Sequence, residues 1–201
     1  MYKINLEMQT ERSLQNAMSG VEDYAHIKFM VNKYLQNELI NPYEALAILL
    51  ALDTGLRASD MLNLRANDIY FNGTARWYEC KSYIQKTNVP DHIRTIALDT
   101  YNLYKAILDE TYIKHTNDFI FTNPKTNKQF TRFWLNKRAK LLFGFNWHKL
   151  RKISAMYVIN KGGTLVDAKI HLAHKRISST DSYLGVSQKQ NQERLKSLYG
   201  Y

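Results

Sequence analysis

Residues 41–64 read NPYEALAILLALDTGLRASDMLNL, and several helix signals follow one another in them. Asn41 is a preferred N-cap residue, and Pro42 suits a first helical turn, where no backbone N–H is required. Residues 43–52 are almost wholly apolar, which predicts a helix that is buried on all sides. Gly55 follows in the position of a glycine that ends a helix. The stretch therefore predicts a buried helix with two well-defined ends.

Patterns on both sides of this stretch predict an α+β fold, mostly helical, with a small antiparallel sheet. Apolar residues recur at helical spacing in several segments, and Asn72-Gly73 is a strong hairpin signal. Helices are expected over 21–37, 59–64, 99–110, 131–142, 147–160 and 164–172. Strands are expected over 68–71, 75–84 and 94–98. The loop between the last two strands is expected to contain Pro90.

The chain has 201 residues, which is enough for one domain with a short arm. Residues 1–20 are polar and weakly patterned, so we expect an N-terminal arm or linker. Residues 21–186 are expected to form the folded domain. Residues 187–201 form a tail whose pattern is helix-like over 187–198.

The basic residues are concentrated in one part of a chain whose formal net charge is +10. Residues 119–166 contain ten Lys or Arg and no Asp or Glu. Such a segment is typical of a surface that binds a polyanion, and a basic surface without a ligand is the alternative. No long helix pairs a basic face with a continuous apolar face, which argues against a membrane surface as the partner.

The sequence also excludes several protein classes. No apolar run approaches the roughly 20 residues that span a bilayer, and the N-terminus lacks the apolar core of a signal peptide, so a cytoplasmic location is expected. Cys80 is the only cysteine, which excludes an internal disulfide and a cysteine-based zinc site. We expect Cys80 to be an ordinary strand residue.

His148 and Arg151 lie three residues apart on a predicted helix, so they share a face. They are expected in its first turn, where backbone N–H groups and the helix dipole favour an anion. A guanidinium there can hold two phosphate oxygens through its fork. The alternative is that both are surface residues at a helix start.

Three further polar residues complete the set of candidates. Arg57 follows the stop of the buried helix, where it presents its charge at the rim of the core or pairs with Asp53 or Asp60 in a structural salt bridge. His174, taken alone, is more often a loop histidine. Tyr183, taken alone, is more often a core or surface residue. The order and spacing of the whole set are what favour a shared function.

In that order and spacing the chain resembles the catalytic domain of the tyrosine recombinases, the phage integrase family. The first family motif is similar to residues 51–64, which contain Thr54-Gly55-Leu56-Arg57. The second is similar to His148-Lys149-Leu150-Arg151, and the third runs from Leu172-Ala173-His174 to Tyr183. Ala173 stands where the family usually has glycine. The resemblance covers about residues 40–185 and makes 21–186 the expected catalytic domain.

The resemblance implies a role for each candidate residue. Tyr183 would attack a DNA phosphate and form a 3′-phosphotyrosine with release of a 5′-hydroxyl. Arg57 and Arg151 would stabilise the charge on the non-bridging oxygens. His148 would do acid–base work, and His174 would hydrogen-bond the same phosphate.

The family also places a lysine on a β-hairpin between the first two motifs, where it protonates the leaving 5′-oxygen. Lys86, in Gln85-Lys86-Thr87, fits this position best, and Lys81 is the alternative. The family reaction uses neither metal nor ATP, so the resemblance implies no cofactor.

The implied function is a site-specific DNA recombinase, integrase-like and of a phage or other mobile element. Its implied partners are double-stranded DNA and further copies of the chain, as a dimer to tetramer on DNA. Residues 1–40 are too few for the helical core-binding domain that most family members carry. That domain is expected on an accessory DNA-bending or clamp protein, in a part of the protein outside this sequence, or not at all. The tail after residue 186 would dock on a neighbouring protomer, or else fold on its own core.

Two other functions fit the basic segment. One is a DNA-binding regulator of recombination without chemistry, which has no need of the candidate catalytic residues. The other is a type IB topoisomerase-like enzyme, which relaxes DNA through the same phosphotyrosine chemistry. The two arginine motifs and the short length favour the recombinase.

Overall fold

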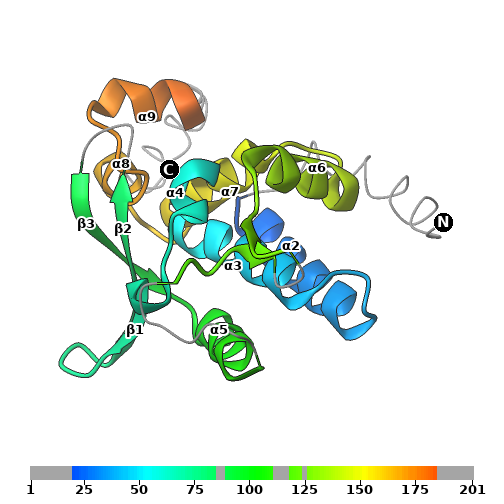
Figure 1. Ribbon diagram of the computed structural model, residues 1–201. Helices are drawn as coiled ribbons and strands as arrows, with labels where there is room; N and C mark the ends of the chain where they lie inside the picture. Colours follow the sequence, from blue (N-terminus) through cyan, green and yellow to red (C-terminus); the bar gives the residue numbers. More distant parts are fainter. Residues whose placement is uncertain (1–19, 85–88, 111–117, 124–125, 185–201) are drawn as a thin grey trace.

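The computed structural model describes residues 20–84, 89–110, 118–123 and 126–184 (Figure 1). Helices dominate this part of the chain, and a three-stranded antiparallel sheet lies at one side of them. The predicted α+β class is therefore confirmed. The expected N-terminal arm, except residue 20, and the expected tail lie outside the described residues.

Helix α3 (Pro42–Thr54) forms the centre of the core and has the predicted ends. The Asn41 side chain accepts a hydrogen bond from Glu44 N, and the Glu44 side chain accepts one from Asn41 N, both at 3.0 Å. Every residue from Tyr43 to Leu52 is buried. Gly55 ends the helix in the left-handed conformation. Helices α2 and α7 and strand β3 pack directly against α3, which explains why its whole circumference is apolar.

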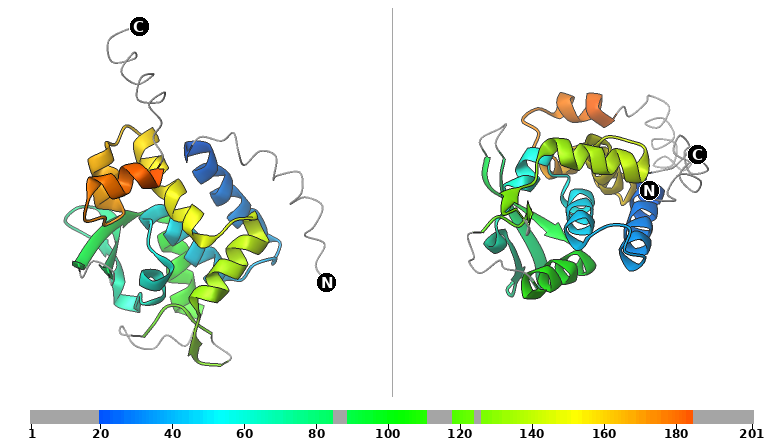
Figure 2. Two further views of the ribbon diagram at one scale, coloured as in Figure 1. Left: turned by 90° about the horizontal axis from the view of Figure 1, so that it is seen from above. Right: turned by 45° about the vertical axis from the view of Figure 1, so that its right-hand side comes forward.

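The other helices surround α3 and agree with the predicted segments within a few residues. α9 is the exception: it has only eight residues and begins with Ile-Ser-Ser-Thr, all weak helix formers, and the sequence did not predict it. It packs against α7 and α8 (Figure 2). The helices are α2 (Gly20–Gln36), α4 (Ala58–Leu62), α5 (Leu98–Glu110), α6 (Arg132–Phe143), α7 (Trp147–Asn160), α8 (Leu165–His171) and α9 (Ile177–Leu184), with a 3-10 turn at η1 (Ala66–Asp68).

The sheet has the order β1-β2-β3 and is antiparallel throughout. Its first turn differs from the expected Asn-Gly turn, because the residue with positive φ is Arg76 rather than Gly73. The Asn72 side chain accepts from Ala75 N at 3.0 Å and so stabilises a longer loop. Cys80 is a fully buried strand residue, as predicted, and burial raises its pKa to about 12. The strands are β1 (Ile69–Asn72), β2 (Trp77–Ile84) and β3 (Val89–Ile96).

Strand β3 begins earlier than expected, so Pro90 belongs to the strand and not to the loop before it. β3 lies at the edge of the sheet, where a residue without an N–H is tolerated. A second ladder, β4 (Thr122–Asn123) with β5 (Lys128–Gln129), precedes α6, and Gln129 donates to the Leu62 carbonyl at the end of α4. This bond places β5 beside the turn that carries Arg57.

The basic segment does not present all of its charges to solvent. Arg138 donates to Glu44 of α3 at 3.1 Å, and Arg151 is buried. The exposed cations of the segment among the described residues are Lys128, Arg132, Lys137, Lys140 and Lys161. They come from β5, α6 and the end of α7. In the described part of the chain, none of the helices has the length and apolar character needed to cross a membrane.

Candidate active site

Arg57 stands at the turn between α3 and α4, where it is the N-cap residue of α4. Its Nη1 lies 3.7 Å from Oδ2 of Asp60, and the Arg57 side chain is 20% exposed while that of Asp60 is fully buried. Asp60 is therefore the salt-bridge partner, and the alternative partner Asp53 is wrong. Asp53 instead accepts hydrogen bonds from two hydroxyls and one backbone N–H, those of Tyr24, Thr100 and Ala97.

The turn that precedes Arg57 packs against the end of α8. Gly55 has a φ of +60°, and a β-carbon there would lie 3.0 Å from Leu172 Cδ2 and 3.1 Å from His171 Nε2. Both the backbone conformation and this close approach favour glycine over any other residue. The motif that contains Gly55 and Arg57 is therefore packed closely against the segment that leads to His174.

Arg151 joins the same two segments through its guanidinium. Its Nη1 donates to the Gly55 carbonyl and its Nη2 to the Leu172 carbonyl, and the side chain is only 2% exposed. Arg151 is the fifth residue of α7, so it begins the second helical turn and does not lie in the first, where it was expected. Two backbone carbonyls, rather than the helix N-terminus, orient this arginine.

His148 lies in the first turn of α7 and is exposed. The N-cap Asn146 makes no side-chain cap bond, and Asn136 of α6 accepts from Trp147 N at 3.1 Å in its place. His148 and Arg151 thus sit on neighbouring turns of one helix with different surroundings. A ligand in solution can reach the imidazole of His148 directly.

His174 follows α8 in a tight C-terminal turn. Its N–H donates to the Lys169 carbonyl at 3.0 Å, and Ala173 N–H donates to the Ile170 carbonyl at 2.9 Å, which is the Schellman pattern. Ala173 has a φ of +50° and occupies the position of this motif that glycine usually fills. The departure from the family glycine is therefore accommodated without a change of backbone.

The imidazole of His174 connects α8 to α9. Its Nδ1 lies 3.0 Å from Oγ1 of Thr180, which is fully buried on α9. Tyr183 is the seventh residue of the same helix, and the structure describes only its backbone. Residues three apart share a helix face, so position 183 lies on the side of α9 that Thr180 occupies.

The hairpin lysine stays undecided between the two candidates. Lys86 lies outside the described residues. Lys81 lies in β2 opposite Ile93 and is half-buried, in a cavity that Asp60 also lines. Lys81 is therefore near the carboxylate that pairs with Arg57. Among the described residues, no cluster of three or more His, Cys, Asp or Glu side chains could hold a metal ion.

Two basic residues next to the site, the buried Arg94 and the half-buried His171, were missed by sequence analysis. Arg94 of β3 donates from Nε to the His171 carbonyl at 3.0 Å. His171 Nε2 lies 2.7 Å from Ser154 Oγ, and burial, followed by the charges of Arg94 and Arg151, lowers the pKa of His171 to about 3. Its ring is neutral near pH 7. The alternation of β3 could have indicated Arg94, because Arg94 and Ile96 point inward together.

The site therefore unites three of the predicted motifs. Backbone and side-chain contacts bring together the Arg57 turn, Arg151 of α7 and the segment of His174, and His148 lies one turn from Arg151. The candidate nucleophile Tyr183 is on the helix that contacts His174.

Known proteins share both the sequence and the fold of this chain. The sequence model of the phage integrase family matches residues 21–190. The tyrosine recombinase XerC of Oceanobacillus iheyensis is 32% identical over 143 residues, which cover 67% of this chain and 46% of the relative. XerC of Staphylococcus aureus is 26% identical over 150 residues, which cover 68% of this chain and 47% of the relative. The chain thus spans about half the length of these curated relatives.

Solved structures show the same fold. The XerA recombinase superposes with a TM-score of 0.68 at 18% identity, over 89% of this chain and 61% of that one. The XerH site-specific recombinase bound to its difH substrate superposes with a TM-score of 0.64 at 18% identity, over 83% of this chain and 51% of that one. The family model covers most of the chain, and the resemblance predicted from the motifs is confirmed: the chain belongs to the phage integrase family.

Proposed function

We propose that this chain is the catalytic domain of a site-specific DNA recombinase that breaks and rejoins DNA through a 3′-phosphotyrosine. The observation that supports this function best is the bridge made by Arg151 between the Arg57 turn and the His174 segment. It gathers two arginine motifs and a histidine motif, far apart in sequence, around one place. Guanidinium groups suit the extra negative charge of a pentavalent phosphate.

In the proposed reaction Tyr183 Oη attacks the scissile phosphate, a new P–O bond to the tyrosine forms, and the bond to the 5′-oxygen breaks. A phenol has a pKa of about 10, so the hydroxyl needs a partner that accepts its proton. The exposed His148 is the proposed acid–base group, and the hairpin lysine, Lys86 or Lys81, gives a proton to the leaving 5′-oxygen. The ester keeps the bond energy, and attack by a 5′-hydroxyl reverses the steps.

His174 is the proposed hydrogen-bond donor to the same phosphate. The Thr180 hydroxyl engages its Nδ1 and orients the ring, and Nε2 is the proposed donor to the phosphate oxygen. The same contact holds α9 against the His174 turn. His174 thus supports the position of the helix that carries the nucleophile.

The DNA-binding surface is proposed to begin in the groove beside Arg57. The groove joins α4 to the start of α6, and its lining is mostly polar: Arg57, Ser59, Leu62, Asn63, Gln129, Phe130, Thr131 and Arg132. The exposed cations Lys128, Lys137 and Lys140 continue from it along β5 and α6. Such a row of cations contacts phosphates and makes binding strongly salt-dependent.

The assembly around this domain is part of the proposal. Residues 21–186 act as the catalytic domain, in the cytoplasm, and two to four copies bind double-stranded DNA. An accessory DNA-bending or clamp protein, or a core-binding domain, holds the opposite face of the DNA. The tail from residue 187 docks on a neighbouring protomer, and removing it should impair assembly on a two-site DNA while the domain stays folded.

A covalent-trapping assay tests the proposed function. The protein is incubated with duplexes from the DNA that flanks its gene, each with a nick next to a candidate cleavage position, so that the short 5′-hydroxyl strand diffuses away. The wild type should accumulate a protein–DNA adduct, and Tyr183→Phe should abolish it. Tyr157→Phe is the matched control, because the half-buried Tyr157 stacks on Tyr24 and lies under Lys161 through its ring, which phenylalanine keeps.

The alternatives give different results in the same assay. Adduct formation by Tyr183→Phe would refute the assigned nucleophile. Sequence-specific binding without any adduct from the wild type would indicate a regulator of recombination. An adduct on every duplex, with relaxation of a plasmid that lacks a specific site, would indicate a topoisomerase-like enzyme.

A further inference from the structure

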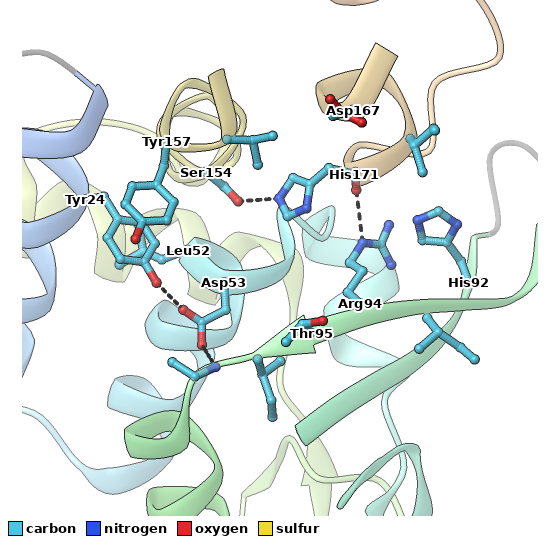
Figure 3. Close-up of a pocket in the computed structure, with 15 residues that line it drawn as sticks. Tyr24, Leu52, Asp53, His92, Arg94, Thr95, Ser154, Tyr157, Asp167 and His171 are labelled. Carbon is cyan, nitrogen blue, oxygen red and sulfur yellow. Dashed lines mark hydrogen bonds between the residues drawn. The ribbon is translucent and has the colours of Figure 1, made fainter. Parts of the chain in front are cut away.

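Arg94 is a buried arginine whose side chain crosses from the sheet to α8 (Figure 3). It lies on β3 opposite Cys80 and is 4% exposed. Nε donates to the His171 carbonyl at 3.0 Å, and Nη1 donates to Ser82 Oγ of β2 at 2.8 Å. Arg94 therefore fastens both strands of the β2–β3 hairpin to the C-terminus of α8.

The carbonyl that Arg94 holds is next to the one that Arg151 holds. Arg94 binds the carbonyl of His171, and Arg151 binds that of Leu172. His174 follows two residues later, after the turn at Ala173. Two arginines from different elements thus fix consecutive peptide groups directly before a candidate phosphate ligand. One of them comes from the helix of the second motif and the other from the hairpin.

Stability alone does not account for an arginine at this place. Burial lowers the pKa of Arg94 to about 10, so the side chain is still charged near pH 7. Its Nη2 is buried and has no hydrogen-bond partner among the described residues. A buried charge with an unsatisfied donor is costly, and an apolar side chain of similar length is often the more stable choice. An apolar side chain cannot replace the hydrogen bonds that Arg94 donates to Ser82 and His171.

The two strands that Arg94 fastens carry both candidate lysines. Lys81 is the residue before Ser82 in β2, and Lys86 belongs to the connection between β2 and β3. Whichever lysine protonates the leaving oxygen, its distance from the phosphate depends on how the hairpin is docked. The bond from Arg94 to α8 is a direct link between that hairpin and the phosphate-binding segment.

We propose that Arg94 is a positioning residue of the recombination reaction. It locks the β2–β3 hairpin to the end of α8 and so keeps the hairpin lysine in line with the leaving 5′-oxygen. This inference rests on the proposed phosphotyrosine chemistry. Replacement of Arg94 should therefore impair protonation of the leaving group and not the structure as a whole.

The experiment compares two matched substrates, an ordinary DNA phosphodiester and one with sulfur in place of the bridging 5′-oxygen. A thiol has a pKa of about 8.5, so the sulfur leaves without a proton from the lysine. Arg94→Met keeps the length of the side chain and removes all its donors. The Arg94→Met variant should cleave the phosphodiester roughly 100-fold more slowly than wild type. A loss of this size is typical when a catalytic group is displaced by about 1 Å. On the sulfur substrate its loss should be under about 5-fold.

The ratio of the two cleavage rates is the decisive readout, because the fraction of folded protein cancels in it. Arg94→Lys keeps one donor group and should give an intermediate ratio. Arg138→Met is the control: Arg138 also joins two elements, through Glu44 of α3, but lies outside the site. Its ratio should equal that of wild type.

Equal losses on both substrates for Arg94→Met, or no loss on either, would overturn the positioning role while leaving the proposed function intact. The same shifted ratio in Arg138→Met would overturn it too, since any loss of packing would then suffice. A wild type that forms an adduct with neither substrate would refute the proposed function itself, and this inference with it.

Discussion

Helix α3 and the C-terminal pair α8–α9 are held in the fold by different forces. α3 is surrounded by apolar side chains along its whole length and belongs to the large core. The pair contributes to a small apolar cluster, in which Ala168 and Leu172 pack with Ala155 of α7, and it exposes Val166, Ile170 and Ile177. Its position depends on hydrogen bonds from Arg94 and Arg151 and on the contact between His174 and Thr180.

The difference separates stability from function. Apolar burial is non-directional, so α3 supplies most of the stabilisation without fixing any one catalytic atom. Hydrogen bonds are directional, and they fix the peptide groups that precede His174. The part of the fold that carries His174 and Tyr183 is therefore expected to open more easily than α3. Substitutions in each region should show this contrast.

The largest effect is expected from Leu50→Ala in the middle of α3. Leu50 is fully buried, and removal of such a side chain costs about 2–5 kcal/mol through lost burial and the cavity left behind. Urea unfolding should show the full loss in one transition, and amide exchange should speed up over the whole domain. Exchange that speeds up only around α3 would contradict its central role.

A smaller effect is expected at the junction of the two regions, in Gly55→Ala. The new β-carbon would meet Leu172 and His171 at 3.0–3.1 Å, in a backbone conformation that disfavours alanine. We expect a loss of about 1–3 kcal/mol in stability, because the strained conformation and the displaced end of α8 both add to the cost. Adduct formation should fall by far more than the unfolded fraction explains.

Gly73→Ala is the matched control for this prediction. Gly73 lies in the β1–β2 loop with open space around its Cα and without a positive φ. It should leave both stability and adduct formation near wild type. If Gly55→Ala behaves in the same way, the close fit between the first motif and α8 is unimportant.

The smallest effect, with the opposite sign, is expected from Ala173→Gly in the C-terminal pair. Ala173 has a φ of +50°, which costs an alanine about 1 kcal/mol relative to glycine in the same conformation. The variant should be more stable by about 0.5–1 kcal/mol, measured by thermal unfolding. Ala168→Gly, in the helix preceding the turn, should instead lower stability by about 1 kcal/mol. If both substitutions raise the stability, the left-handed conformation of the turn is not the cause.

Much of the fold could be predicted because its signals are local. The capping of α3 by Asn41, its apolar run and its stop at Gly55 depend on neighbouring residues, and the structure has all three. The turn before β2 and the helix α9 could not be predicted in the same way. Arg76 takes the left-handed position in place of Gly73, and α9 is a short helix that begins with weak helix formers and packs on α7 and α8. Tertiary contacts override weak local preferences at such places.

The same distinction between local signals and tertiary contacts applies to the candidate site. The order and spacing of Arg57, His148, Arg151, His174 and Tyr183 identified the family from the sequence, because the chemistry on a phosphate requires those side chains. The partners that orient them are backbone carbonyls and distant residues, which carry no sequence signature. Only the tertiary structure shows Arg151 on the carbonyls of Gly55 and Leu172, and Arg94 on that of His171. A sequence records which groups are present, whereas a directional hydrogen bond depends on where the folded chain brings them together.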